Sequence, residues 1–157
     1  MLGDLEPAWT EGLAELDLPK LGVRGNHDAP DALSAVGVED LHLRAVELGG
    51  LSFSGFGGSP RYSRHGANEW TEEEAEEMLA SLPAADVLLT HSPPEGVNDE
   101  PDDHVHRGSA ALRTWVERHE PGWLLHGHTL PNLALAVSRL GPTRVVHVRG
   151  AVTIELG

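Results

Sequence analysis

Two short apolar runs that end in histidines place the strongest constraint on how this chain folds. The segment Asp86–Thr90 reads Asp-Val-Leu-Leu-Thr and is followed by His91, and Trp123–Leu125 is followed by the histidine pair of His126–His128. A short, continuous apolar run is typical of a strand that is buried on both faces. Because ligands in open α/β sheets bind at the carboxyl ends of strands, the two runs predict a sheet with histidines along one edge.

Elsewhere in the chain, helical patterns alternate with strand patterns early, and strand patterns dominate late. We therefore expect one domain over residues 1–157 with an α/β fold, a layered α/β sandwich of two mixed β-sheets flanked by helices. The predicted helices are Trp9–Leu16, Asp31–Val36, Thr71–Leu82 and Ser109–His119; the predicted strands are Lys20–Arg24, Leu41–Leu48, Leu51–Phe56, Asp86–Thr90, Trp123–Leu125, Leu133–Leu140, Arg144–Val148 and Ala151–Leu156.

Composition excludes several classes of protein. The chain has no cysteine, so disulfide frameworks and thiolate metal sites are excluded, and a metal must use His, Asp, Asn or Glu. The formal net charge of −14 opposes binding to nucleic acid, where cationic side chains must neutralise phosphates.

The location follows from two further features. No run approaches the ~20 apolar residues of a membrane span, and the first residues lack the pattern of a secretory signal. We therefore expect a cytoplasmic protein with no membrane partner, and the Ala-, Gly- and Pro-rich composition favours a GC-rich bacterial source.

Four short segments offer oxygen and nitrogen ligands at or just after predicted strands. They are Gly3-Asp4, Gly25–Asp28, Thr90–Pro94 and His126–Thr129. A glycine beside a ligand lets the backbone turn sharply and approach an ion or a phosphate. Taken singly, each segment fits an ordinary turn or a hydrogen-bonded surface histidine equally well. Their joint presence in this order is far more specific.

In this order the segments resemble the calcineurin-like metallophosphoesterase superfamily, whose pattern runs Asp-x-His, Gly-Asp, Gly-Asn-His-Asp/Glu, His and Gly-His-x-His. The similarity extends from Gly3 to Leu130. Gly55–Pro60, the double proline after His91 and Arg107–Ser109 are also similar to the branch of small bacterial and brain-type phosphodiesterases.

The resemblance implies a two-metal site for manganese, iron or zinc. Asp4 would be the carboxylate that bridges both metals. Asn26, His91 and His128 would be the neutral ligands that complete the coordination of the second metal.

The same resemblance implies two catalytic residues that do not bind metal. His27 would stabilise a phosphoryl oxygen or protonate the leaving group, and Asp28 would orient His27. The implied reaction is hydrolysis of a phosphomono- or phosphodiester by metal-activated water.

Two departures from the family pattern affect the first metal. No Asp-x-His motif precedes Gly3, and Leu130 stands where the family usually has a second histidine. The chain is therefore expected to form one complete metal site, with the other crippled or empty. We also expect the family's first strand to be missing, because the true start would lie upstream of Met1. His126 would either replace the lost ligand or simply line the pocket.

The alternative reading is a catalytically weak or inactive relative that binds one metal or a nucleotide. A small phosphoester is the expected substrate in the first reading, and an incomplete sheet would favour a homo-oligomer.

Two loops carry further polar residues with open roles. Asp102–His106 would line a substrate entrance or form a solvated loop. Arg61 and Arg64 would clamp a phosphate or pair with the acidic helix at Glu72–Glu77.

Overall fold

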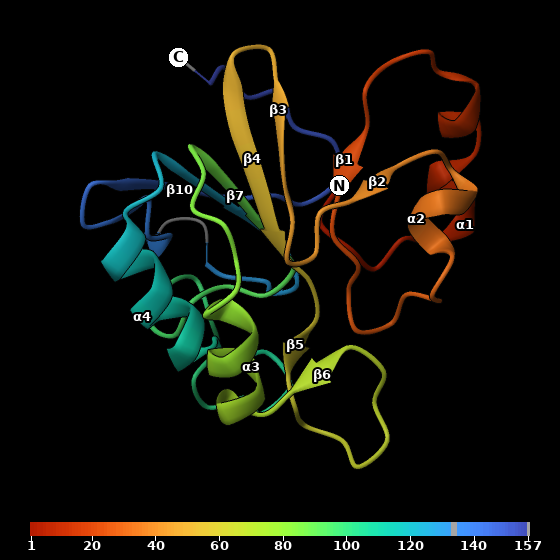
Figure 1. The fold of residues 1–157 in the computed structure, drawn as a ribbon. Helices are drawn as coiled ribbons and strands as arrows, with labels where there is room; N and C mark the ends of the chain where they lie inside the picture. Colours follow the sequence, from red (N-terminus) through yellow and green to blue (C-terminus); the bar gives the residue numbers. More distant parts are fainter. Residues whose placement is uncertain (133–134, 157) are drawn as a thin grey trace.

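A six-stranded sheet forms the centre of the molecule, with strand order β3-β4-β7-β8-β10-β9 (Figure 1). The structure is a computed structural model that describes residues 1–132 and 135–156. The strands of this sheet are β3 (Ala45–Leu48), β4 (Leu51–Phe56), β7 (Val87–Thr90), β8 (Trp123–His126), β9 (Arg139–Leu140) and β10 (Thr143–His147).

The four central strands run parallel, and the two edge strands are antiparallel to their neighbours. The expected α/β fold with a mixed sheet is confirmed. Parallel pairing of β4, β7 and β8 brings their carboxyl ends, Phe56, Thr90 and His126, to one edge of the sheet. This edge is where the sequence predicts histidines.

Two helices, α3 (Glu72–Leu79) and α4 (Ala110–His119), cover one face of this sheet (Figure 1). Their apolar side chains pack on alternate strand residues such as Leu88 and Leu124, which are fully buried. Each helix begins at a hydroxyl cap: Thr71 forms the predicted capping box with Glu74, and the Ser109 side chain accepts from the N–H of Leu112.

The other face of the sheet carries the second set of alternating residues, including Val87 and Leu89, which pack with Val23 and Leu41. Here the second layer of strands is small. Strand β1 (Leu21–Gly22) pairs in parallel with β2 (Glu39–Asp40), and Met1 extends this pair through hydrogen bonds with the backbone of residues 21 and 23. The helices α1 (Pro7–Thr10) and α2 (Ala32–Ala35) and a 3₁₀ turn at Leu13–Glu15 flank this layer.

The helices α3 and α4 and the strands β4, β7, β8 and β10 follow the sequence predictions closely, whereas the strand predicted at Leu41–Leu48 is shortened to β3. The strand predicted at Ala151–Leu156 is wrong, because this segment pairs with no described strand and Val152 is 53% exposed. Of the strand predicted at Leu133–Leu140, residues 133–134 lie outside the described part, and only β9 forms. The pair of β5 (Ser59–Pro60) and β6 (Glu69–Trp70) was not predicted.

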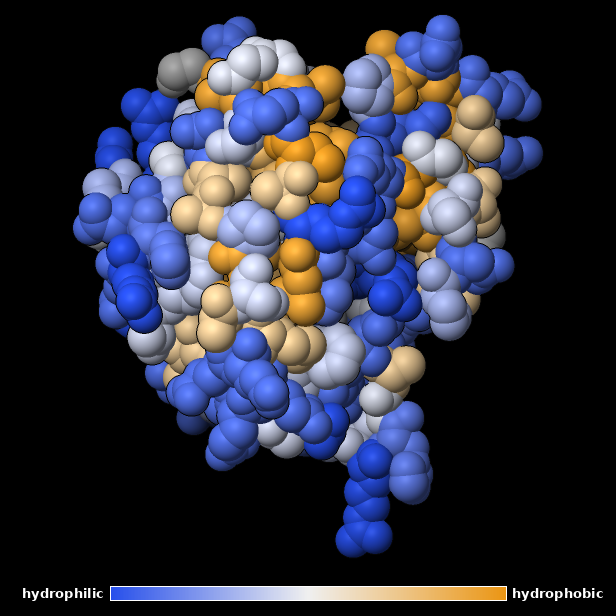
Figure 2. All heavy atoms as spheres, in the orientation of Figure 1, coloured by the Kyte–Doolittle hydropathy of each residue, from blue (hydrophilic) through white to orange (hydrophobic). Residues whose placement is uncertain are grey.

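The described helices include none that is long and apolar enough to cross a membrane. Figure 2 shows a largely hydrophilic surface on this side, with apolar residues gathered between the β3–β4 hairpin and the region of α1 and α2.

Candidate metal centre

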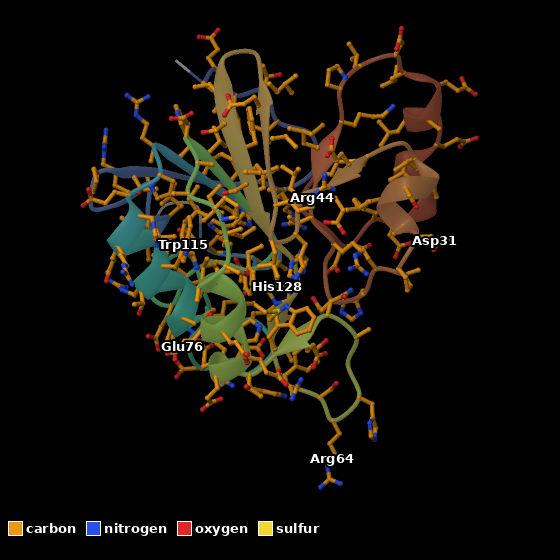
Figure 3. All side chains as sticks on the ribbon, viewed as in Figure 1. Asp31, Arg44, Arg64, Glu76, Trp115 and His128 are labelled. Atoms are coloured by element: carbon orange, nitrogen blue, oxygen red, sulfur yellow. The ribbon has the colours of Figure 1, made fainter. Side chains whose placement is uncertain are left out.

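The four sequence segments meet at the carboxyl ends of the parallel strands. His91 directly follows β7 and is held to β4 by a hydrogen bond from its N–H to the carbonyl of Phe56 (3.3 Å). Gly127, just after β8, donates to the carbonyl of His91 (3.0 Å). His128 therefore lies beside His91 at the strand ends, near the middle of the molecule (Figure 3).

Two glycines allow the first two segments to touch. A Cβ on Gly3 would lie 2.2 Å from the backbone nitrogen of Gly25, and a Cβ on Gly25 would lie 2.1 Å from Oδ1 of Asp4. Gly3 also has a φ of +84°, which side chains disfavour. The glycines before Asp4 and Asn26 are therefore required by close backbone approach.

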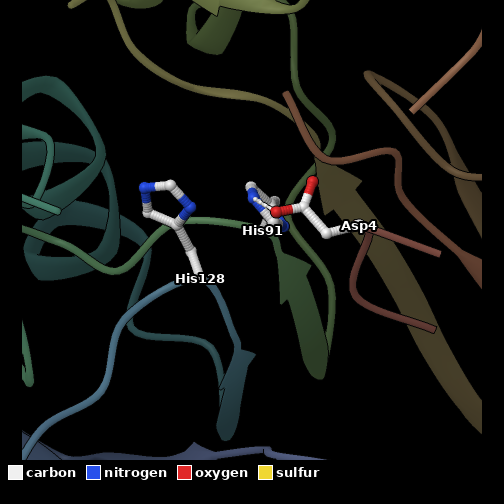
Figure 4. A group of neighbouring side chains, drawn as sticks. All are labelled: Asp4, His91 and His128. Carbon is white, nitrogen blue, oxygen red and sulfur yellow. Dashed lines mark ion pairs between the residues drawn. The ribbon is translucent and has the colours of Figure 1, made fainter. Parts of the chain in front are cut away.

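Asp4, His91 and His128 form one group whose possible ligand atoms all lie within 4.8 Å of one another (Figure 4). His91 Nε2 is 3.5 Å from Oδ2 of Asp4 and 3.0 Å from Oδ1 of Asn26. All four residues expected to bind the second metal thus come together, and we call them the central group.

Both histidines of the central group have one ring nitrogen tied to a backbone carbonyl. His91 Nδ1 donates to the carbonyl of Leu2 (2.7 Å), and His128 Nε2 donates to the carbonyl of Val105 (2.9 Å). A carbonyl only accepts, so in a neutral ring the other nitrogen keeps its lone pair. In Figure 4 that second nitrogen of His128 faces His91 and Asp4.

Burial keeps both imidazoles neutral. It lowers the pKa of His91 below its usual value, against the opposing charge of Asp4, and it lowers the pKa of His128 to about 4. At pH 7 the centre therefore presents lone pairs and a carboxylate. Histidine ligands of metals commonly have this arrangement, with the outer N–H fixed by a carbonyl.

The donor set fits a divalent metal. Nε2 of His91 carries a lone pair and faces the oxygens of Asp4 and Asn26, which also carry lone pairs. Hydrogen-bond acceptors therefore lie opposite one another at short distance. A cation relieves this opposition. Imidazole nitrogen with carboxylate and amide oxygen suits manganese, iron or zinc.

The expected catalytic pair, His27 and Asp28, lies beside Asp4. The Asp28 carboxylate accepts three backbone N–H groups, from Asp4 (2.9 Å), Leu5 (2.7 Å) and Gly25 (2.7 Å), and none of these bonds reaches the His27 ring. His27 is exposed, and its backbone N–H donates to Oδ1 of Asp4 (3.1 Å). Asp28 thus joins the first segment to the second through the backbone, and its expected role in orienting His27 stays a prediction.

His126 is fully buried behind the centre. Its Nε2 accepts from Nδ2 of Asn98 (3.0 Å), and its Nδ1 lies 3.2 Å from the carbonyl of Gly127. Burial lowers its pKa to about 4. Since both ring nitrogens have partners in the protein, the geometry favours a structural histidine over a substitute ligand.

Sequence reasoning missed two polar residues of the centre. Asn26 Nδ2 donates to the hydroxyl of Tyr62 (2.9 Å), which arrives from the loop before β6. Asn98 holds the segment after His128, because its carbonyl accepts from the Thr129 hydroxyl (2.7 Å). Tyr62 is the only tyrosine in the chain, but no pattern around it marks a site residue.

The structure places Arg61, Arg64 and Leu130, whose roles the sequence left open. Arg61 pairs with Glu74 of the acidic helix (2.8 Å), and Arg64 points away from the molecule (Figure 3). The Leu130 side chain is 59% exposed, and its N–H donates to the carboxylate of Glu100 (3.1 Å).

An α/β sheet with a carboxylate, an amide and two neutral imidazoles at its strand ends defines a metal-binding member of the α/β class. The chain belongs to the calcineurin-like phosphoesterase family, whose model matches residues 2–132. This family comprises metal-dependent phosphoesterases that bind divalent metals.

Solved structures agree on the fold. One crystal structure matches with a TM-score of 0.62 and 24% sequence identity, over 88% of this chain and 60% of the other. This chain therefore spans about 60% of the length of that solved chain, and the likeness concerns the fold. A comparison with curated proteins found no match.

Proposed function

We propose that this protein hydrolyses small phosphomono- or phosphodiesters with water, using a divalent metal held by the central group. The observation that carries the proposal is the fixed orientation of His91 and His128: each donates one N–H to a backbone carbonyl and directs its other nitrogen to the centre. Manganese, iron and zinc all suit these ligands.

Each residue has a distinct proposed role. Asp4 supplies the negative charge at the centre, and Asn26 adds a neutral oxygen held by Tyr62. His27, exposed beside Asp4, would hydrogen-bond a phosphoryl oxygen or protonate the leaving group. When bound, a divalent metal lowers the pKa of a water and offsets the charge that develops on the phosphoryl group.

The setting is proposed from composition. The charge of −14 favours small phosphoesters over nucleic acids, and a cytoplasmic bacterial enzyme that can self-associate is consistent with the sequence. A salt-sensitive affinity for DNA would instead support the hypothesis that the protein is a nuclease.

The test is hydrolysis of bis(p-nitrophenyl) phosphate and p-nitrophenyl phosphate with added manganese. We expect activity that a chelator abolishes and manganese restores. Asp4→Ala and His128→Ala should each reduce it at least about 100-fold, because each removes a direct ligand. The control is His119→Ala, which changes an exposed histidine stacked on Trp115 of α4 and should keep full activity.

The second candidate is a relative that binds one metal or a nucleotide without turnover. Leu130, at the position where the family pattern has a histidine, favours it. Manganese bound by the wild type and reduced in both variants, without hydrolysis of either ester, would establish the one-metal form of this candidate. Absence of bound metal in the wild type would overturn metal-dependent hydrolysis and the one-metal form of the second candidate, and would leave nucleotide binding without turnover.

A further inference from the structure

A second cluster of ligand-type side chains lies on the loop that follows His91. Glu100, Asp103 and His106 offer two carboxylates and one imidazole, and their possible ligand atoms all lie within 4.8 Å of one another. We call these three residues the loop group. The central group uses none of them.

The backbone explains why these three side chains converge. Asp103 N–H donates to the carbonyl of Glu100 (2.9 Å), and His106 N–H donates to the carbonyl of Asp103 (3.1 Å). Two successive bonds of this i+3 to i kind align side chains spaced three residues apart on one side. Glu100 N–H then donates to the carbonyl of His106 (3.1 Å), which closes the loop on itself.

The donors of the loop group are oriented as ligands. Nδ1 of His106 lies 2.7 Å from Oδ2 of Asp103, so in a neutral ring the lone pair stays on Nε2. Two carboxylates at this separation repel each other, and a cation between them removes the repulsion.

The loop group also lies directly beside the central group. The rings of His106 and His128 are 5.3 Å apart between centroids, and the neighbouring Val105 carbonyl accepts from Nε2 of His128. Glu100 accepts from the N–H of Leu130, two residues after His128. One loop therefore both fixes His128 and brings three donors of its own next to it.

We propose that Glu100, Asp103 and His106 bind a second divalent cation, beside the one held by the central group. Two carboxylates with one imidazole suit manganese, iron or zinc, the ions that also suit the central group. This inference goes beyond the proposed function and does not depend on it, because the two groups share no residue.

The experiment measures bound manganese per chain by elemental analysis after equilibrium dialysis against manganese chloride. The variants are Asp103→Asn with His106→Gln in the loop group, and Asp4→Asn with His91→Gln in the central group. Asp102→Asn is the matched control, since it removes the same charge from an exposed neighbouring position. Circular dichroism checks that each variant is folded.

We expect the wild type and Asp102→Asn to bind about two manganese ions, one for each group, and each double variant to bind about one. Electron paramagnetic resonance should show coupled manganese in the wild type and isolated manganese in both double variants.

Each of the other outcomes shows which of the two groups binds manganese. One ion that is lost only in the central-group variant overturns the loop site and leaves the proposed function standing. One ion that is lost only in the loop variant supports the loop site and overturns the proposed centre. No bound ion overturns both. If the loop variant fails to fold, the central-group variant decides: about one retained ion supports the loop site, and none overturns it.

Discussion

At the scale of single residues, the central group depends on side chains that are not among its four members. Asp28 is the clearest case, because its carboxylate binds the backbone of two segments that lie more than twenty residues apart in sequence. It holds Asp4 in place through the backbone.

Replacing Asp28 by alanine should therefore affect both stability and metal binding. The change leaves three backbone N–H groups without an acceptor, so we expect the free energy of unfolding to fall by about 3 kcal/mol. Manganese affinity should fall at least about tenfold, as for other residues that support ligands. Urea denaturation and manganese titration measure the two effects. Asp31→Ala, an exposed carboxylate that forms no cap bond in α2, should change stability by less than about 0.5 kcal/mol.

His42 predicts how stability depends on pH. Its ring stacks on Phe56 and Trp70, and its Nδ1 accepts from the N–H of Gly57 (3.0 Å). Burial lowers the pKa of His42 below 6.5, although Asp40 opposes the shift. As pH falls below 6.5, the unfolded chain takes up a proton that the folded chain resists, so this contribution to stability is lost with acidification.

The variant His42→Gln should lose less stability than the wild type between about pH 7 and pH 5, since it has no such group to protonate. Urea denaturation of both metal-free proteins across this range gives the comparison. Parallel curves would contradict the assignment to His42.

At the scale of elements, α3 shows how a local signal fixes a helix. The Thr71 hydroxyl accepts from Glu74 N–H (3.2 Å), and the Glu74 carboxylate accepts from Thr71 N–H (2.9 Å). The capping box begins the helix that contributes Ala75 and Leu79 to the core cluster with Leu88, so its loss should destabilise the domain.

Thr71→Ala should lower the free energy of unfolding by about 1 kcal/mol. Thr114→Ala is the matched control, because Thr114 is an exposed threonine inside α4 that bonds only a carbonyl of its own helix. Alanine is the better helix former, so the control should be neutral or slightly more stable. An equal loss in both variants, measured by urea denaturation, would exclude a cap effect.

The helices and strands that could be predicted are those whose local sequence pattern favours the same structure as their packing and strand pairing in the fold. The apolar run of β7 and the capping box of α3 each select one structure locally. Ala151–Leu156 has a strand-like composition, but a strand needs a hydrogen-bonding partner, and the order of strands in the sheet gives this segment none in the described part of the chain.

The same distinction holds for the centre. That Asp4, Asn26, His91 and His128 lie close together was predictable, because polar residues at or after strands, in this order, form a recognisable pattern; their role as ligands stays a prediction. The support from Val105 and the new role of Asp28 were not predictable. They depend on which loop folds over which strand end, and no local pattern carries that information.

At the scale of the whole molecule, charge dominates the surface. The net charge of −14 lies on 157 residues, and the exposed face in Figure 2 is mainly hydrophilic. Self-repulsion of this size opposes the compact state.

Added salt should therefore stabilise the metal-free protein. Raising sodium chloride from about 0.01 M to about 0.15 M shortens the screening length from about 30 Å to about 8 Å. We expect the free energy of unfolding to rise by about 1 kcal/mol, measured by thermal denaturation. Choline chloride should give the same rise, which would exclude specific sodium binding. A fall in stability would mean that exposed ion pairs such as Arg61 with Glu74 outweigh the repulsion.

The parallel order of β4, β7 and β8 has a consequence for how the protein acquires its metal in the cell. The central group draws on positions 4, 26, 91 and 128, and the segment after His128 is fastened by His147 of β10, whose Nε2 donates to the carbonyl of Thr129 (2.8 Å). During synthesis, a ribosome-bound chain that has exposed only the first two segments holds Asp4 and Asn26 without either imidazole. The four side chains come together only after β8 and β10 have left the ribosome and joined the sheet, so a metal held by all four of them would be bound after this sheet has formed.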